Sequence, residues 1–285
     1  MKNKISNKKN FFSKLLIKII RKFGYEIIDQ ANLKIPDINK NINENLSKSG
    51  SKSITIPLGI TNIKNKINSL TIIIRSYTFG DIKESKVMLD QNKQRIYELP
   101  KIEYTLRTIK SVIRSCEYAK ESFKALNFKI IVTDDKSTKH SLDRINELLK
   151  ATNFNTQIIK LEEKEFENEI QLKDINGQDI SKNMMSNMRN ILKSIKISQE
   201  ENSDLFYFLE DDYIHTKNAI AEMLFTYEKL STQLDKELFL CPADYPYLYS
   251  NIDESKILFG NKSHWRTVNE SLITFMTSKK MINKY

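Results

Sequence analysis

The sequence predicts an α/β domain built on a mostly parallel central sheet that is flanked by helices. Short β-branched or aromatic runs such as "LTIIIRSY" (residues 70–77) alternate with longer segments of helical periodicity, which is typical of parallel strands joined by crossover helices. With 285 residues, 40% of them hydrophobic, the chain can bury one such core. No apolar run approaches the ~20 residues needed to span a bilayer.

The expected elements follow one another in a regular order. Strands are predicted at 70–77, 128–135, 156–162 and 205–212, and helices across 106–116, at 142–149, near 183–198 and near 217–230. Further strand candidates are "ELFLCPADYP", "KILFG" and "SLITFMTS", while residues 80–99 form a polar excursion.

Residues 1–30 predict a basic amphipathic helix. Eight basic residues and no acidic one precede Glu26, and "FFSKLLIKIIRKF" (11–23) places apolar residues four apart, with Lys14 and Lys18 on the other side. Such a helix suits the surface of an anionic membrane; a helix packed on the domain and a partner-binding tail are the alternatives. Residues 31–68 read as a linker or loose strap, although "SITIPLGI" could pair at a sheet edge.

Charge and cysteine content narrow the class of protein. The net charge of +10 suggests acidic partners, yet it accompanies a general excess of Lys, Asn and Ile that base composition alone can produce. We expect no nucleic-acid binding, because the basic residues form a tail rather than a face of the domain. Cys116 and Cys241 are too few for a disulfide framework and lack metal-ligand spacing. The expected location is cytoplasmic, with peripheral contact at the inner face of the cell membrane.

Polar side chains end three of the predicted strands. Ser76 and Tyr77 follow the first, Asp134 and Asp135 the second, and Glu210 to Asp212 the fourth. Ligands of parallel sheets bind beyond the carboxyl ends of the strands, so these groups should converge. The six glycines form neither G-x-G-x-x-G nor a P-loop, and neither G-x-S-x-G nor H-E-x-x-H occurs.

The pair Asp211 and Asp212 suggests a metal site. Carboxylates at a strand end suit Mg²⁺ or Mn²⁺, with substrate phosphates completing the shell. Adjacent strand residues point to opposite faces, so one of the two should hold the metal directly. The other would bond a ribose hydroxyl or brace the loop. The alternative is an acidic N-cap for the following helix.

Three segments in order resemble the GT-A fold nucleotide-sugar glycosyltransferases, most closely family 2. "TIIIRSYT" is similar to V-S-V-I-I-P-T-Y-N, and "IIVTDDKSTKHS" to V-V-D-D-G-S-T-D. "NMRNILKSIKISQEENSDLFYFLEDDYI" is similar to A-R-N-x-G followed by Y-I-x-F-L-D-D-D. The resemblance covers about residues 70–230. It implies a GT-A-like, Rossmann-like sheet with a nucleotide-sugar-binding half at 69–235 and an acceptor-side half at 236–285.

The resemblance also implies roles for the matching residues. Tyr77 would lie against the nucleobase, beside Ser76 and Asp134, and Asp135 would accept a hydrogen bond from the base edge. Asp212 would hold the metal that bridges the diphosphate, with Asp211 toward the ribose or sugar and Arg189 near the nucleotide. Three residues depart from the pattern and put the loop geometry in doubt: Arg75 at the proline or threonine, Lys136 at the glycine and Glu210 at an apolar or aspartate position.

The acceptor side is less well marked. Trp265 and Arg266 combine a stacking surface with a cation and are candidates for acceptor binding, against a core role for Trp265. An inverting transfer needs a general base, usually a carboxylate. In the resembled family this base commonly follows a strand like "SLITFMTSKKMI", which lies close to Tyr285. The base is therefore Asp244 or Glu270, or it lies beyond this chain in a longer protein.

The resemblance implies a metal-dependent, inverting glycosyltransferase. It would move a sugar from a nucleoside diphosphate sugar to a glycan or lipid-linked acceptor, with Mn²⁺ or Mg²⁺ as cofactor. The alternative is a non-catalytic nucleotide-sugar-binding or scaffold relative in a surface-polysaccharide pathway. His140 and His215 are expected at helix starts or on the surface.

Overall fold

The computed structural model describes residues 11–25, 62–78, 100–162, 164–170, 173, 177, 179–245 and 255–285. The chain divides into two units, residues 1–63 and 64–285. The possible edge strand "SITIPLGI" and the whole polar excursion at residues 80–99 fall outside the described residues, as does most of the expected linker.

In the first unit the predicted N-terminal helix is present as α1 (Phe11–Lys22). Leu15, Leu16 and Ile19 on this helix are exposed, and the basic residues Arg21 and Lys22 occupy its last turn. Among the described residues, no helix has the length and apolar character to cross a membrane.

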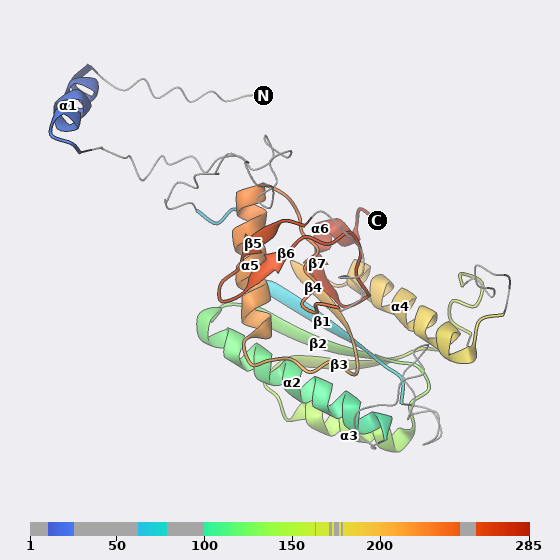
Figure 1. Cartoon of the computed structure of the whole chain (residues 1–285). Coiled ribbons are helices and arrows are strands. Elements are labelled where there is room, and N and C mark those ends of the chain that lie inside the picture. The colour runs from blue at the N-terminus through green and yellow to red at the C-terminus, as the bar shows by residue number, and fades with distance from the viewer. Residues whose placement is uncertain are drawn as a thin grey trace. The chain divides into compact units, whose positions relative to one another are not determined.

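The second unit is built on a five-stranded sheet (Figure 1). Its strands are β1 (Ser69–Ser76), β2 (Asn127–Asp134), β3 (Asn155–Lys160), β4 (Leu205–Glu210) and β7 (Phe275–Ser278). The order is β3-β2-β1-β4-β7, and only the β4–β7 pairing in this sheet is antiparallel. The prediction of a mostly parallel, helix-flanked sheet is confirmed.

The helices follow the strands as the alternation predicts. They are α2 (Lys101–Ser122), α3 (Lys139–Lys150), α4 (Lys182–Glu200), α5 (Ala219–Leu234) and the short α6 (Lys279–Ile282). A separate antiparallel pair comprises β5 (Ile257–Phe259) and β6 (His264–Arg266).

Alternate residues of each central strand enter two cores, as the two-residue period of a strand requires. Ile72 and Ile74 pack into the larger core with residues of α2, α3 and α5. Ile73 and Phe206 pack into the smaller core with Ile197 of α4. Burial on both faces explains why the strand sequences are continuously apolar rather than alternating.

One strand candidate forms less structure than its composition suggested. In "ELFLCPADYP" the described part makes a single bridge, between Leu240 and Met276. Pro242 has no backbone N–H to donate to a neighbouring strand, so pairing cannot continue through it. β7 likewise begins only at Phe275, because Ser271 and Leu272 before it are exposed.

Candidate nucleotide and metal site

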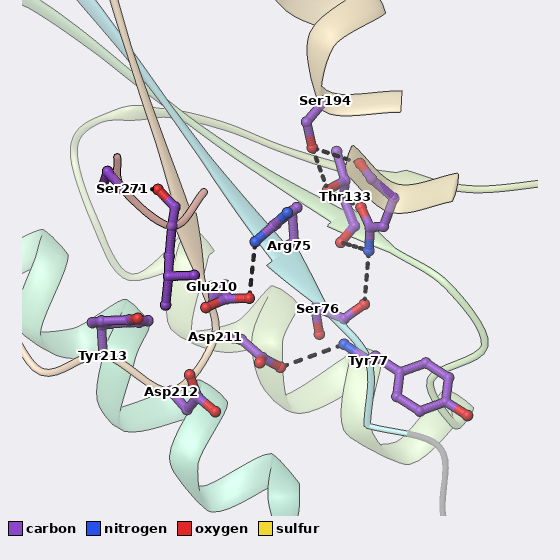
Figure 2. Close-up of polar contacts among 12 residues, drawn as sticks. Arg75, Ser76, Tyr77, Thr133, Ser194, Glu210, Asp211, Asp212, Tyr213 and Ser271 are labelled. Carbon is purple, nitrogen blue, oxygen red and sulfur yellow. Dashed lines mark hydrogen bonds and ion pairs between the residues drawn. The ribbon is translucent and has the colours of Figure 1, made fainter. Parts of the chain in front are cut away.

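The polar strand ends lie at one edge of the sheet. β1 pairs with both β2 and β4, and the registers place Ser76 beside Asp134 and Arg75 beside Glu210. The chain therefore brings together residues that are more than 130 positions apart in sequence, as predicted from the strand order of parallel sheets (Figure 2).

Asn190 of α4 ties the ends of β1 and β2 together. Its Nδ2 donates to the carbonyl oxygens of Ser76 at 3.1 Å and Thr133 at 3.3 Å. Its Oδ1 accepts the Thr133 hydroxyl at 2.5 Å, and the side chain is buried. The Ser76 carbonyl also accepts the backbone N–H of Asp135, and the Thr133 hydroxyl also contacts that of Ser194. Asn190 is thus the buried side chain that joins the ends of the two strands within a larger hydrogen-bond network.

The loop after β2 is held by its own polar groups. Asp134 Oδ2 accepts the backbone N–H of Ser137 at 3.1 Å, and the Ser137 hydroxyl accepts the N–H of Thr78 at 3.0 Å. Burial raises the pKa of Asp134, and the Ser137 hydrogen bonds partly offset that rise. Lys136 has φ 68°, the left-handed conformation that glycine adopts most easily. The backbone shape associated with the family's glycine is therefore kept, at the cost of strain.

Asp135 and Arg189 form a buried pair next to this loop. Arg189 Nη1 lies 3.9 Å from Asp135 Oδ2, and the two residues are 3% and 1% exposed. The guanidinium also donates to the carbonyl oxygens of Glu165, at 2.8 Å, and Glu162. Asp135 Oδ2 has no hydrogen-bond partner among the described residues. This oxygen is thus an acceptor suited to an N–H donor of a ligand.

Asp211 and Asp212 converge on a single cation, the ammonium group of Lys101. Lys101 Nζ lies 2.7 Å from Asp211 Oδ1 and 3.2 Å from Asp212 Oδ2. The other oxygen of Asp211 accepts the Thr105 hydroxyl at 2.8 Å and the backbone N–H of Tyr77 at 3.4 Å. The phenol ring of Tyr77 points away from the three carboxylates (Figure 2).

The first carboxylate of the triplet has a different partner. Glu210 Oε1 lies 3.1 Å from Nη2 of Arg75. The Arg75 residue is only 4% exposed. Burial raises the pKa of Glu210, and Arg75 opposes that rise. Nε and Nη1 of Arg75 have no hydrogen-bond partner among the described residues. Two of the three departures from the resembled pattern, Arg75 and Glu210, therefore form an ion pair with one another across β1 and β4.

Asp211 and Asp212 are suited to a divalent cation that also binds the phosphates of a ligand. Among the described residues no cluster of three or more His, Cys, Asp or Glu side chains could enclose a metal. Asp211 and Asp212 nevertheless direct one oxygen each at the same cation. A protein usually contributes one or two carboxylates to a Mg²⁺ or Mn²⁺ site, and substrate phosphates supply further ligands.

The candidate acceptor residues lie in two groups. Arg266 Nη2 donates to Asp244 Oδ1 at 2.8 Å, and next to Asp244 the hydroxyl of Tyr245 lies 2.8 Å from that of Tyr213. Tyr213 directly follows Asp212 in the sequence, so the segment that contains Asp244 and Tyr245 contacts the segment that contains the carboxylates. Glu270 is exposed.

Trp265 is anchored by Glu222 of α5. Its Nε1 donates to Glu222 Oε1 at 3.3 Å, and its ring packs against the larger core. The same carboxylate accepts the backbone N–H groups of Asn261, Lys262 and Ser263, which lowers its pKa against the effect of burial. A Cβ at Gly260 would lie 2.2 Å from Glu222 Oε1, so this turn needs glycine.

A hollow of about 810 Å³ lies at the opposite edge of the sheet. Its lining includes Ser69, Asn127 and Asn155 at the amino ends of β1, β2 and β3. The buried side chains of Asp134, Asp135, Asp211 and Arg189 are at the other end of the strands, where the loops of a parallel sheet form binding sites. We therefore place the candidate site at the carboxyl edge.

Three contributors to the edge were not among the predicted site residues. Lys101, Thr105 and Asn190 reach the strand ends from α2 and α4. Asn190 follows Arg189 in the A-R-N motif, which is a usable sequence signal. Lys101 and Thr105 belong to a helix more than 100 residues before Asp211, so only the folded arrangement identifies them.

Comparisons with solved structures find similar chains. S. aureus TarS and a fragment of it match with 9% and 12% identity and TM-scores of 0.41 and 0.40, each over 76% of this chain. The inositol-1-phosphate CTP transferase from T. maritima matches at 10% identity over 76% of this chain and 73% of its own, with a TM-score of 0.32. Core-mannan synthase A from Aspergillus fumigatus, in its Mn/GDP form, matches at 10% identity over 67% of this chain and 41% of its own, with a TM-score of 0.24.

The chain spans 29% of the length of TarS and 48% of the fragment. No protein-family model and no curated protein sequence matches it. The function of the chain is therefore argued from its own residues.

Proposed function

We propose that this chain is a glycosyltransferase that moves a sugar from a nucleoside diphosphate sugar to a hydroxyl group of a glycan or lipid-linked acceptor. One observation carries the proposal. A buried acceptor atom of Asp135 and a convergent pair of carboxylates, Asp211 and Asp212, directly follow β2 and β4, the two strands that flank β1. A nucleoside diphosphate has an N–H-bearing base at one end and a phosphate group that binds metal at the other.

The protein's residues have distinct tasks in this proposal. Asp135 accepts an N–H of the base, and Arg189, 3.9 Å away, orients that carboxylate. Tyr77 offers a ring to the base. Asn190 and Ser137 keep the described ends of β1 and β2 at a fixed separation, so binding does not have to bring these strand ends together.

Asp212, with Asp211 beside it, would hold a divalent Mn²⁺ or Mg²⁺. When bound, such a cation supplies positive charge that offsets the charge developing on the leaving diphosphate. Asp211 is the more buried of the two, and one of its oxygens accepts the Thr105 hydroxyl and the Tyr77 N–H. Its contribution is to fix the position of the strand end, while Asp212, whose side chain is 29% exposed, presents its carboxylate outward.

On the acceptor side, Asp244 is the better placed of the two candidate bases. It neighbours Tyr245, whose hydroxyl contacts that of Tyr213 beside the carboxylates. Arg266 pairs with Asp244 and would orient it. Removal of a proton from the acceptor hydroxyl by this group would permit direct displacement with inversion. A base outside this chain stays an alternative.

Release of nucleoside diphosphate from UDP- and GDP-linked sugars tests the proposal. We expect slow hydrolysis by the purified chain and faster release once an acceptor is supplied, with at least about a hundred-fold loss on Asp212→Ala. Asp143→Ala, which removes an exposed carboxylate of α3, is the matched control. Binding of the sugar nucleotide without release under any condition would favour the non-catalytic relative.

The base is assigned with two isosteric changes. Asp244→Asn should abolish transfer and leave sugar-nucleotide binding intact, whereas Glu270→Gln should retain transfer. The reverse pattern would make Glu270 the base, and retention of transfer in both variants would exclude both residues.

The location that fits this function is the inner face of the cell membrane, where α1 would hold the chain near lipid-linked acceptors. Exposed Leu15, Leu16 and Ile19 and the basic end of the helix support this role.

A further inference from the structure

Lys101 occupies the point at which the two carboxylates of the candidate metal site converge. Its Nζ is within hydrogen-bonding distance of Asp211 Oδ1 and Asp212 Oδ2, and its side chain is only 15% exposed. Lys101 is the first residue of α2, and Thr105, one turn later, bonds the same Asp211. The start of α2 is thus built around these carboxylates.

The oxygens of Asp211 leave little choice about where a metal can bind. Oδ2 already accepts the Thr105 hydroxyl and the Tyr77 N–H. Oδ1 is the oxygen that Lys101 contacts, at the shortest distance in the cluster. A divalent cation that takes Oδ1 and an oxygen of Asp212 would lie where the ammonium group lies, and the two positive charges would repel.

We propose that Lys101 is a built-in counter-cation that a divalent metal must displace to occupy the Asp211–Asp212 pair. This inference rests on the proposed function only in assigning a metal to that pair. The ammonium neutralises the two carboxylates when no metal is bound and weakens metal affinity through competition. Metal uptake therefore requires the Lys101 side chain to swing away from both aspartates.

The local charges support this competition. Glu210, Asp211 and Asp212 carry three negative charges, and Arg75 and Lys101 contribute two positive ones. Arg75 is buried against Glu210 and has no comparable freedom. Lys101 has a flexible stem at a helix start and is the cation that can leave. Its departure restores the negative charge that attracts a divalent ion.

Titration of Mn²⁺ alone, followed by the loss of the free-ion electron paramagnetic resonance signal, tests the proposal without any nucleotide or activity. We expect Lys101→Met to bind Mn²⁺ at least about ten-fold more tightly than the native chain, because a charge-assisted contact no longer has to be broken. Lys129→Met is the matched control. It removes the same charge from an ion pair with Glu201 at the opposite edge of the sheet and should leave Mn²⁺ affinity unchanged.

Two further variants separate competition from a change in folding. Lys101→Arg keeps the charge and should bind Mn²⁺ as weakly as the native chain, whereas Lys101→Gln should behave like Lys101→Met. A fixed concentration of Mn²⁺ should also raise the melting temperature of both neutral variants by more than it raises that of the native chain. Equal affinity in Lys101→Gln, Lys101→Arg and the native chain would overturn the proposal.

The outcome is distinguishable from failure of the proposed function. If UDP or GDP binds the native chain while Lys101 variants show unaltered Mn²⁺ affinity, the function stands and the counter-cation role falls. If no variant binds Mn²⁺ at all, the counter-cation role also falls. If Lys101→Met tightens Mn²⁺ binding but no nucleoside diphosphate binds, the counter-cation role stands and the proposed function falls.

Discussion

Arg189 Nη1 lies 3.9 Å from Asp135 Oδ2, and both side chains are almost completely buried at the carboxyl edge of the sheet. A buried carboxylate is costly unless it is paired, and Asp135 Oδ2 has no hydrogen-bond partner among the described residues. The proposed function gives this oxygen a partner, an N–H donor of the nucleobase.

This arrangement predicts that Asp135→Asn weakens nucleoside diphosphate binding. An amide can present only one acceptor and would place an N–H donor in a site built for an acceptor. We expect at least about a ten-fold loss of affinity by calorimetry. Asp143→Asn, on the exposed face of α3, should bind like the native chain; unchanged binding in Asp135→Asn would remove this residue from the site.

Lys136 predicts a gain in stability on substitution by glycine. Its φ of 68° lies in the left-handed region, which costs a residue with a Cβ roughly 1–2 kcal/mol, partly offset by the greater unfolded-state freedom of glycine. Lys136→Gly should raise the free energy of unfolding by roughly 0.5–1 kcal/mol in urea denaturation. Lys136→Ala removes the same charge but keeps the Cβ, so it should give no such gain; equal gains in both variants would make charge, not backbone strain, the cause.

His215 makes stability depend on pH. Tyr207 Oη contacts its Nε2 at 2.8 Å, and burial lowers its pKa to about 4. The unfolded chain binds a proton near pH 6.5 and the folded chain does not until about pH 4, so stability falls as pH is lowered through that window.

We expect His215 to account for up to roughly 3 kcal/mol of that loss by pH 4. His215→Gln keeps a hydrogen-bonding group but cannot take up the proton, so its unfolding free energy should fall less between pH 6.5 and 4. His140→Gln, on an exposed position of α3, is the control and should follow the native curve. If the free energy of unfolding falls equally with pH in His215→Gln and in the native chain, His215 is not the source of the pH dependence.

The N-terminal helix predicts binding to anionic vesicles. Its exposed apolar side chains and the basic residues 14, 18, 21 and 22 suit a negatively charged surface. The native chain should sediment with phosphatidylglycerol vesicles and not with phosphatidylcholine vesicles, and Lys14→Glu with Lys18→Glu should abolish the difference. Lys150→Glu with Lys236→Glu changes the net charge by the same amount, at exposed positions of the second unit. This control variant should still prefer phosphatidylglycerol vesicles.

The sheet was predictable because its signals are local. The β-branched runs of β1, β2 and β4 are apolar on both faces, and crossover helices between them impose a parallel arrangement. The order of the strands then placed Ser76, Asp134 and Glu210 at one edge. The failure of "ELFLCPADYP" to form a strand was also local, since Pro242 was visible in the sequence.

The contacts within the site were less predictable because they join distant segments. Nothing near Lys101 indicates that its ammonium group would bridge Asp211 and Asp212. Arg75 and Glu210 looked like separate departures from a family pattern, and only the β1–β4 register shows that they compensate one another. Trp265 carried an aromatic signal for ligand binding, whereas its indole N–H bonds Glu222.

Calorimetric titration of the full chain with UDP, GDP, CDP and ADP, in the presence and absence of Mn²⁺, tests the central claim most directly. The account predicts that UDP or GDP binds, that Mn²⁺ tightens this binding, and that Asp212→Asn removes the effect of Mn²⁺. The absence of binding by all four nucleotides under both conditions would contradict it.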